Sequence, residues 1–298
     1  MFKMKKQLIA DLGLLFVTIG WGASFILTKV ALASLATYNF LAIRFILAFI
    51  ISSLIFSKRM LNLDRRTVKY GLTLGVILFL HYGLQTVGLN YTTPSKSAFI
   101  TGINVILVPL FSTLLLKQLP EKRVIFSTIL AFIGLGLLTL NHTSLQVNIG
   151  DIYTFLCAFV FASYIILVGR FTGQSESIGL AVLQLGVVGG LSLLTSFIIE
   201  SPTLPTKPGV WLTIGTLSVV CTSGAYIIQS LAQRYTTPTH TALIYTAEPV
   251  FAAGFGFLIY GSILSRQGLL GAVLILSGML LTEVDFTKAW TKYKELTD

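Results

Sequence analysis

Glu248 is the most chemically informative residue of this chain, because it is the only acid near the middle of a long hydrophobic run. An ionisable side chain at membrane depth is costly and is therefore a functional candidate. Glu248 could bind the ammonium group of a substrate or take up a proton. Its alternative role is structural, as a packed carboxyl group hydrogen-bonded beside the helix kink expected at Pro249.

His81 and Arg44 are the other ionisable candidates inside hydrophobic runs. Histidine changes charge near neutral pH, so His81 joins Glu248 as a candidate for proton or cation coupling. A hydrogen-bonded structural histidine is the alternative. Arg44 could receive a substrate carboxylate through its planar guanidinium group, or it could pair with an acid at the membrane interface or extend its charge towards water.

Neutral polar and aromatic residues extend this set. Thr101 precedes Asn104, and Tyr245 precedes Glu248, by three residues, so each pair is expected on one face of a helix. Aromatic rings could stack on a cationic or aromatic cargo, while packing and interfacial belts are their alternative use. The predicted cavity-lining residues are Trp21, Arg44, Tyr82, Gln85, Thr101, Asn104, Tyr164, Tyr226, Gln229 and Tyr245.

Motifs for enzymatic chemistry are missing from the sequence. It has no phosphate-binding loop, no Gly-x-Ser-x-Gly, no His-Glu-x-x-His and no pair of carboxylates at membrane depth. We therefore expect no catalytic residue, no metal site and no cofactor. Cys157 and Cys221 are too few for a metal site or a disulfide framework and are interpreted as packing residues.

The elements that must carry these residues follow from composition. Of the 298 residues, 54% are hydrophobic and 11% are charged, against roughly 25% charged in an average soluble domain. This excludes a soluble enzyme with one large core and predicts an all-α integral membrane protein with ten transmembrane helices. The ten expected spans are 8–29, 38–57, 68–90, 95–116, 123–140, 152–170, 178–199, 209–233, 239–260 and 267–283.

The net charge of +10 is interpreted as a topology signal rather than as affinity for nucleic acid. With the N-terminus in the cytoplasm, 16 of the 21 lysine and arginine residues fall on the inner side and 4 fall outside, as the positive-inside rule requires. We expect a multi-pass protein of the plasma membrane, surrounded by lipids and binding no nucleic acid, with both termini in the cytoplasm.

The sequence contains an internal repeat. Tyr91-Thr92-Thr93-Pro94 returns 144 residues later as Tyr235-Thr236-Thr237-Pro238. The same offset relates Tyr82 to Tyr226, Gln85 to Gln229 and Asn104 to Glu248, and an offset of 140 relates Asp11 to Asp151. Asp11 and Asp151 are interpreted as stabilising helix N-termini.

Each repeat holds five of the predicted spans. The first repeat is assigned to residues 1–147 and the second to residues 148–298, which include a short cytoplasmic tail. An odd number of spans per repeat gives the two halves opposite orientations in the membrane. This arrangement is typical of carriers that open a midplane site alternately to either side.

Four segments carry a further pattern: Trp21-Gly22-Ala23-Ser24-Phe25, Arg44-Phe45, the stretch from Ala98-Phe99 to Pro109, and Glu248-Pro249-Val250-Phe251-Ala252-Ala253. Together they resemble the EamA family of the drug/metabolite transporter superfamily. The resemblance covers nearly the whole chain, and it implies ten helices in two inverted five-helix repeats and the carriage of small metabolites, often outward. The family often has a Gly-Glu pair near the ends of the fourth and ninth spans, where this sequence has Lys117-Gln118 and Gly261-Ser262. A coupling role for those acids is therefore not carried over.

The function expected from these features is secondary active transport of small organic metabolites by alternating access, with efflux of amino acids or related compounds and drugs. A small-molecule substrate is the expected partner, with a proton or counter-substrate, in a monomer or homodimer. An uptake permease or exchanger for nucleotide-sugar or vitamin-like cargo is one alternative. An integral membrane lipid-modifying enzyme and a channel without a transport cycle are two others.

Overall fold

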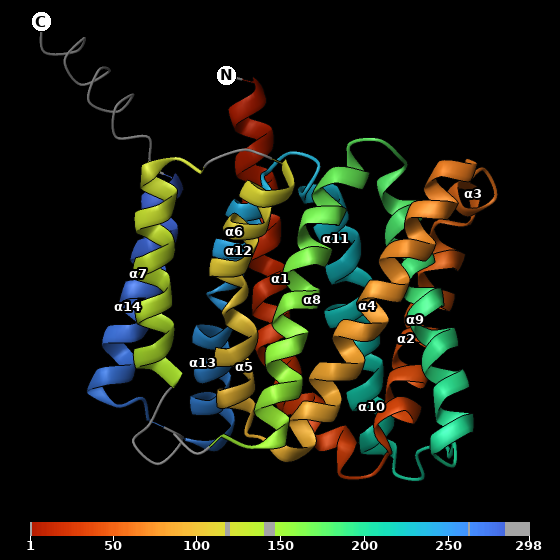
Figure 1. Ribbon diagram of the computed structural model, residues 1–298. Coiled ribbons are helices and arrows are strands. Elements are labelled where there is room, and N and C mark those ends of the chain that lie inside the picture. Colours follow the sequence, from red (N-terminus) through yellow and green to blue (C-terminus); the bar gives the residue numbers. More distant parts are fainter. Residues whose placement is uncertain (1, 117–119, 140–146, 262, 284–298) are drawn as a thin grey trace, which may run out of the picture.

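The computed structural model describes residues 2–116, 120–139, 147–261 and 263–283. Within these ranges the chain is almost entirely helical and has no strand, and the long helices stand side by side (Figure 1). The first half forms α1 (Phe2–Leu32), α2 (Thr37–Ile55), α3 (Ser57–Met60), α4 (Arg65–Tyr91), α5 (Pro94–Gly102), α6 (Asn104–Leu116) and α7 (Lys122–Thr139). The second half forms α8 (Ile149–Thr172), α9 (Ser177–Ile199), α10 (Pro208–Thr216), the π-helical segment η1 (Leu217–Gly224), α11 (Ala225–Ala232), α12 (Pro238–Tyr245), α13 (Glu248–Tyr260) and α14 (Arg266–Glu283).

Nine helical segments of the described chain are long and apolar enough to cross a membrane. Arg266–Leu281, in α14, is a shorter apolar helix at the position of the tenth predicted span. The predicted all-α membrane fold is therefore confirmed. The nine segments are Lys6–Leu32, Thr37–Ile55, Arg65–Tyr91, Lys96–Leu114, Lys122–Thr139, Ile149–Thr172, Ser177–Ile199, Pro208–Ala232 and Pro238–Ile259.

The fourth and ninth spans are each broken into two helices, which the sequence analysis did not foresee. α5 ends at Gly102 and α6 follows it, while α12 ends at Tyr245 and α13 follows it. The repeated Tyr-Thr-Thr-Pro tetrapeptide starts both half-helices, because its second threonine is the N-cap and its proline fits the first turn. The Oγ1 atoms of Thr93 and Thr237 accept hydrogen bonds from the backbone N–H groups of Lys96 and His240, each at 3.2 Å.

Helices of the two halves pack in equivalent pairs. α2 packs on its counterpart α9, α7 packs on its counterpart α14, and α4 contacts α8 as α11 contacts α1. The α7–α14 contact is close because both helices carry glycine there: a Cβ atom on Gly134 would lie 2.6 Å from the carbonyl oxygen of Gly271. Only glycine permits this approach of two backbones.

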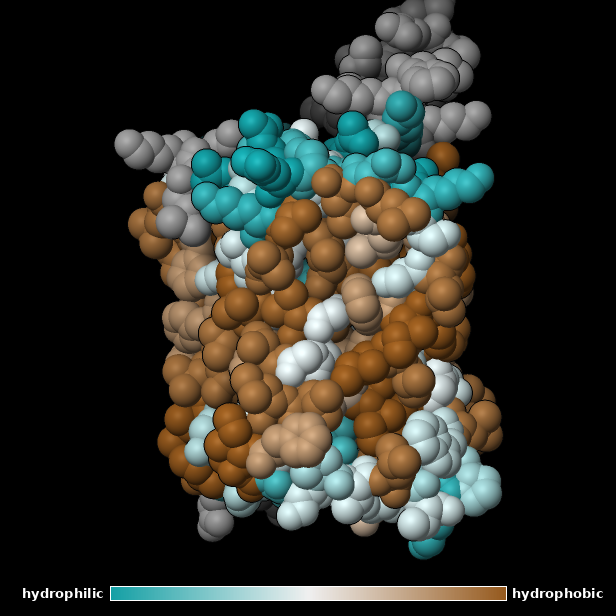
Figure 2. Space-filling model, turned by 90° about the vertical axis from the view of Figure 1, so that its right-hand side faces the viewer, coloured by the Kyte–Doolittle hydropathy of each residue, from teal (hydrophilic) through white to brown (hydrophobic). Residues whose placement is uncertain are grey.

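The outer surface matches a bilayer. Figure 2 shows a hydrophobic belt with hydrophilic residues at the two ends, and the denser group lies at the end where α1 begins and where α3 lies in Figure 1. We call this end the N-terminal face and the other end the opposite face. Large apolar side chains of the lipid-facing belt, such as Leu54 and Ile198, are each 72% exposed, as expected where lipid and not water covers the helices.

Two acids near helix N-termini, Asp64 and Asp151, accept hydrogen bonds from backbone N–H groups there. Hydrogen bonding by Thr67, whose backbone N–H lies 3.1 Å from Oδ1 of Asp64, holds the pKa of Asp64 below its ordinary value. Asp151 completes a capping box with Asn148, the N-cap of α8, which agrees with the prediction for this residue. The same prediction is wrong for Asp11, because α1 begins at Phe2 and Asp11 is buried more than two turns inside it.

Candidate functional site

The two helix breaks position the most conspicuous polar residues. α6 begins at Asn104 and α13 begins at Glu248, so these repeat-related residues both occupy the first position of a half-helix. The breaks lie half-way along the helices in Figure 1. Thr101 and Tyr245 lie on the other side of each break, so each pair is divided between two half-helices and does not lie on one continuous helix. Discontinuous helices at mid-depth are typical of binding sites in secondary transporters.

A cavity of about 20 Å³ lies at this level, lined by helices of both halves. Seven of its nine lining residues were predicted from the sequence, and Ser24 and Phe161 were not. A serine and a phenylalanine in apolar runs carry no signal that separates them from packing residues. The lining residues are Trp21, Ser24, His81, Tyr82, Gln85, Thr101, Phe161, Tyr226 and Glu248.

Aromatic rings form most of the wall. The Trp21 ring centroid lies 5.0 Å from that of Tyr245, 5.6 Å from Tyr226 and 6.0 Å from Phe161. The indole N–H of Trp21 donates to the carbonyl oxygen of Cys221 at 2.9 Å, so the ring is held in place from one side. Such a cluster offers both flat apolar surface and the electron-rich faces that attract cations.

Glu248 lines the cavity, and its carboxylate has no hydrogen-bond or ion-pair partner among the described residues. Its neighbour α1 is close because Gly22 has no side chain. A Cβ atom on Gly22 would lie 2.8 Å from the backbone nitrogen of Ala252 and 2.9 Å from the carbonyl oxygen of Glu248. The glycine after Trp21 therefore brings the aromatic wall and the acid together.

Arg44 is buried, with 2% of the residue exposed, and does not extend its charge towards an interface. Its Nε donates to Oγ1 of Thr222 at 2.7 Å, and its guanidinium carbon lies 5.1 Å from the ring centroid of Tyr82. One terminal nitrogen of the guanidinium group is buried without a hydrogen-bond partner in the described structure. Leaving such a group unpaired is costly, so Arg44 is equipped to receive an anionic group.

His81 has a partner that the sequence analysis did not foresee. Its Nδ1 lies 3.1 Å from Sγ of Cys157, and its ring stacks on Phe161 with centroids 4.3 Å apart. Cys157 was interpreted as a packing residue only, and this contact shows that it also orients the histidine. One edge of the imidazole is thus engaged while the residue still lines the cavity.

Other predicted residues surround the cavity without lining it. Tyr164 donates from its hydroxyl to Oε1 of Gln184 at 2.7 Å, and its ring centroid is 6.2 Å from that of Tyr226. Gln229 donates to Oε1 of Gln233 at 3.1 Å. Asn104 is buried, and its Oδ1 has no partner in the part of the chain that the structure describes. None of these residues, and neither Arg44 nor Tyr245, is among the lining residues of the small cavity.

A larger cavity of about 380 Å³ lies between α1, α5 and α13, on the side of the opposite face. It adjoins the small cavity, because its lining residues Phe25 and Pro249 directly follow Ser24 and Glu248. Small-molecule pockets usually fall between about 300 and 1,000 Å³. The volume of the larger cavity therefore falls within this range.

Some predictions lie outside the described residues. They concern Lys117, Gln118 and Ser262, where the sequence departs from the EamA pattern, and the tail 284–298.

The fold and its buried polar centre define a class: a polytopic membrane carrier in which two inverted repeats enclose residues at mid-depth. The comparison with known families agrees. The chain belongs to the EamA-like transporter family, whose model matches residues 8–140 and 148–284. The resemblance read from the sequence is thereby confirmed.

Individual relatives support the same class. The chain is 32% identical over 287 residues to an uncharacterized transporter of Archaeoglobus fulgidus, covering 94% of this chain and 87% of the relative. It is 27% identical over 288 residues to the uncharacterized transporter YyaM of Bacillus subtilis, covering 92% and 93%. A solved crystal structure with 16% identity superposes with a TM-score of 0.77 over 92% of this chain and 96% of that chain, which shows a shared fold.

Proposed function

We propose that this protein is a secondary transporter that exports amino acids or related small organic compounds across the plasma membrane by alternating access. One observation carries the substrate class. Glu248 lines the central cavity, Arg44 contacts the lining residue Tyr82, and among the described residues no ion pair joins either of them to an opposite charge. Buried charges in proteins are normally paired, so a bound molecule with both signs of charge would complete the site.

A zwitterion suits these two residues. The guanidinium group of Arg44 presents N–H donors in a plane that matches a carboxylate, and the carboxylate of Glu248 suits an ammonium group. Tyr82 connects them, since it lines the cavity with Glu248 and contacts Arg44. The rings of Trp21 and Phe161 would then accept an apolar or aromatic side chain.

The central cavity must widen to accept such a molecule. Its volume of about 20 Å³ is enough for roughly one water molecule. The adjoining cavity of about 380 Å³ lies towards the opposite face. We infer that substrate passes between the two cavities as the halves of the protein move against each other.

The proposed orientation in the membrane rests on charge. Lys58, Arg59, Arg65, Arg66 and Lys69 cluster around α3 and the start of α4, at the N-terminal face. The positive-inside rule puts this face, and both termini, in the cytoplasm. The larger cavity then faces the outside, as a release route for an exporter would. A proton or a counter-substrate would drive the cycle, in a monomer or homodimer.

Counterflow in proteoliposomes tests the proposal. Vesicles are loaded with one unlabelled amino acid at a time, and uptake of the same radiolabelled amino acid is followed; a UDP-sugar and thiamine serve as parallel probes. We expect saturable, trans-stimulated exchange of at least one amino acid. Exchange of the UDP-sugar or thiamine alone would refute the amino-acid assignment in favour of a permease, and conductance without saturation would refute a carrier.

A further inference from the structure

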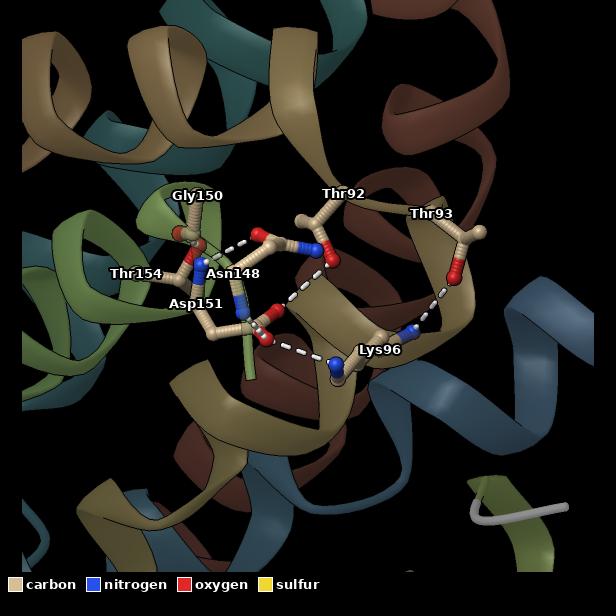
Figure 3. A network of polar contacts seen from close by, with 7 residues as sticks. All are labelled: Thr92, Thr93, Lys96, Asn148, Gly150, Asp151 and Thr154. Carbon is tan, nitrogen blue, oxygen red and sulfur yellow. Dashed lines mark hydrogen bonds and ion pairs between the residues drawn. The ribbon is translucent and has the colours of Figure 1, made fainter. Parts of the chain in front are cut away.

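An ion pair outside the central site joins the two repeats at the opposite face. Nζ of Lys96, on the half-helix α5, lies 2.6 Å from Oδ2 of Asp151, near the start of α8. The other carboxylate oxygen of Asp151 accepts a hydrogen bond of 2.8 Å from the hydroxyl of Thr92. Figure 3 shows the two contacts converging on Asp151, one from Thr92 in the connection between α4 and α5 and one from Lys96 on α5.

The pair is sheltered from solvent. The side chains of Lys96 and Asp151 are 13% and 7% exposed. Exposed ion pairs contribute little to stability, but removing one partner of a sheltered pair is strongly unfavourable. The capping box with Asn148 also fixes the Asp151 carboxylate on α8, so α8 is the anchor and α5 is the element that is held.

The direction in which α5 is held can be read from its two sides. Pro94 and Ala98, one helical turn apart, line the cavity of about 380 Å³. Lys96 is two residues from each, which places it about 200° around the helix, on the side away from the cavity. Contact with Asp151 therefore draws α5 towards α8 and away from α13, which forms the facing wall through Ala252 and Ala253.

We propose that the Lys96–Asp151 ion pair is a positioning contact that keeps the cavity open to the opposite face, and that its release lets α5 close on α13. This inference rests on the proposed alternating access. At the other face the corresponding half-helices α6 and α12 pack against each other. A cavity of about 400 Å³ near that face is lined by α1, α11 and Tyr235 and not by these half-helices. The two pairs of half-helices thus differ in the way that one state of an alternating-access cycle requires.

The equivalent positions in the repeat support a role in the cycle. Asp151 corresponds to Asp11, and Lys96 corresponds to His240. At the N-terminal face, Nε2 of Gln7 lies 3.3 Å from Nδ1 of His240. Gln7 precedes Asp11 by four residues, so the two side chains lie on the same side of α1. Polar contacts at the equivalent positions Lys96 and His240 therefore tie a half-helix to the first helix of a repeat at both ends.

Cysteine accessibility tests the inference without any substrate. The buried Cys157 and Cys221 are replaced by serine, and Ala253→Cys places a thiol on the α13 wall of the cavity. A membrane-impermeant methanethiosulfonate reagent is applied to each side of vesicles in turn. Lys96→Gln is expected to slow labelling from the side of the opposite face by about tenfold or more, because the open arrangement loses a sheltered ion pair.

Controls separate this effect from misfolding. Lys96→Arg keeps the charge and should label at the rate of the parent, as should Lys207→Gln, which alters an exposed lysine at the start of α10. Asp151→Asn retains the cap acceptor, and combined with Lys96→Gln it should slow labelling no further than Lys96→Gln alone.

Unchanged or faster labelling of Lys96→Gln would overturn the inference, since the pair would then be neutral or would hold the cavity closed. Additive effects of the two substitutions would also overturn it. A protein that fails counterflow yet shows the expected labelling would refute the proposed cargo and leave the ion pair's role intact.

Discussion

Tyr82 and Tyr226 occupy equivalent positions in the two repeats, 144 residues apart, and their hydroxyl oxygens are joined by a hydrogen bond of 3.0 Å. Both side chains line the central cavity. A residue that contacts its own repeat-mate must lie near the axis that relates the two halves. Movement of one half against the other therefore changes this contact directly, so the pair marks the centre of the proposed cycle.

Because the two tyrosines share this hydrogen bond, removing either hydroxyl should lower the free energy of unfolding nearly as much as removing both. Tyr82→Phe leaves the hydroxyl of Tyr226 buried without its partner, and we expect a loss of about 1–3 kcal/mol in the free energy of unfolding. Tyr226→Phe should cost a similar amount, and the double variant little more than either. Thermal unfolding in detergent measures these differences. Tyr70→Phe, which removes an exposed hydrogen bond to Gln174, should change stability little, and independent losses at 82 and 226 would contradict a shared bond.

Glu248→Gln should reduce exchange of zwitterionic or cationic substrates by about tenfold or more, because a charge-assisted hydrogen bond worth roughly 1.5–3 kcal/mol becomes a neutral one. Initial counterflow rates at several substrate concentrations provide the measurement. Glu121→Gln alters an exposed acid in a loop and serves as the control. If Glu248→Gln reaches the membrane and exchanges at the rate of the parent, the carboxylate has no role in binding or coupling.

Substitution of Arg44 distinguishes a site for zwitterions from a site for cations. Arg44→Lys keeps the charge but loses the planar arrangement of donors, so carboxylate-bearing substrates should be exchanged about tenfold or more slowly. An amine that lacks the carboxylate should be affected far less. Arg59→Gln, which breaks an exposed ion pair with Glu176, is the matched control. Equal loss for both substrates would point to a structural role for Arg44.

Gly22 and Gly20 form a matched pair on one helix. A Cβ atom on Gly22 would lie within 3 Å of backbone atoms of α13, whereas on Gly20 its nearest neighbour would be Sγ of Cys221 at 3.9 Å. Gly22→Ala should therefore lower the free energy of unfolding by about 1–3 kcal/mol through overpacking, and Gly20→Ala should be tolerated or mildly stabilising. The midpoints of thermal unfolding compare the two variants. Equal midpoints would show that α13 can move away from the added methyl group without loss of stability.

The sequence by itself determined the membrane class, the ten spans and the family of this protein. The membrane class and the spans follow from local properties: apolar runs long enough to cross a bilayer, scarce charges, and a repeated tetrapeptide that caps a helix at Thr93 and again at Thr237. The family follows from the resemblance carried by segments such as Glu248-Pro249-Val250. Much of the cavity lining was also predicted, because Glu248, His81 and the polar aromatic residues are expensive or unusual inside a membrane.

Only the tertiary structure decided how these residues meet. The contacts of His81 with Cys157, of Arg44 with Thr222 and of Lys96 with Asp151 join positions 76, 178 and 55 residues apart, and helical periodicity carries no information across such distances. The breaks before Asn104 and Glu248 belong here too, because a hydrophobic run has the same composition whether one helix or two half-helices cross the membrane. Local sequence sets the cost of placing a residue in lipid, whereas packing between helices selects the partner that offsets it.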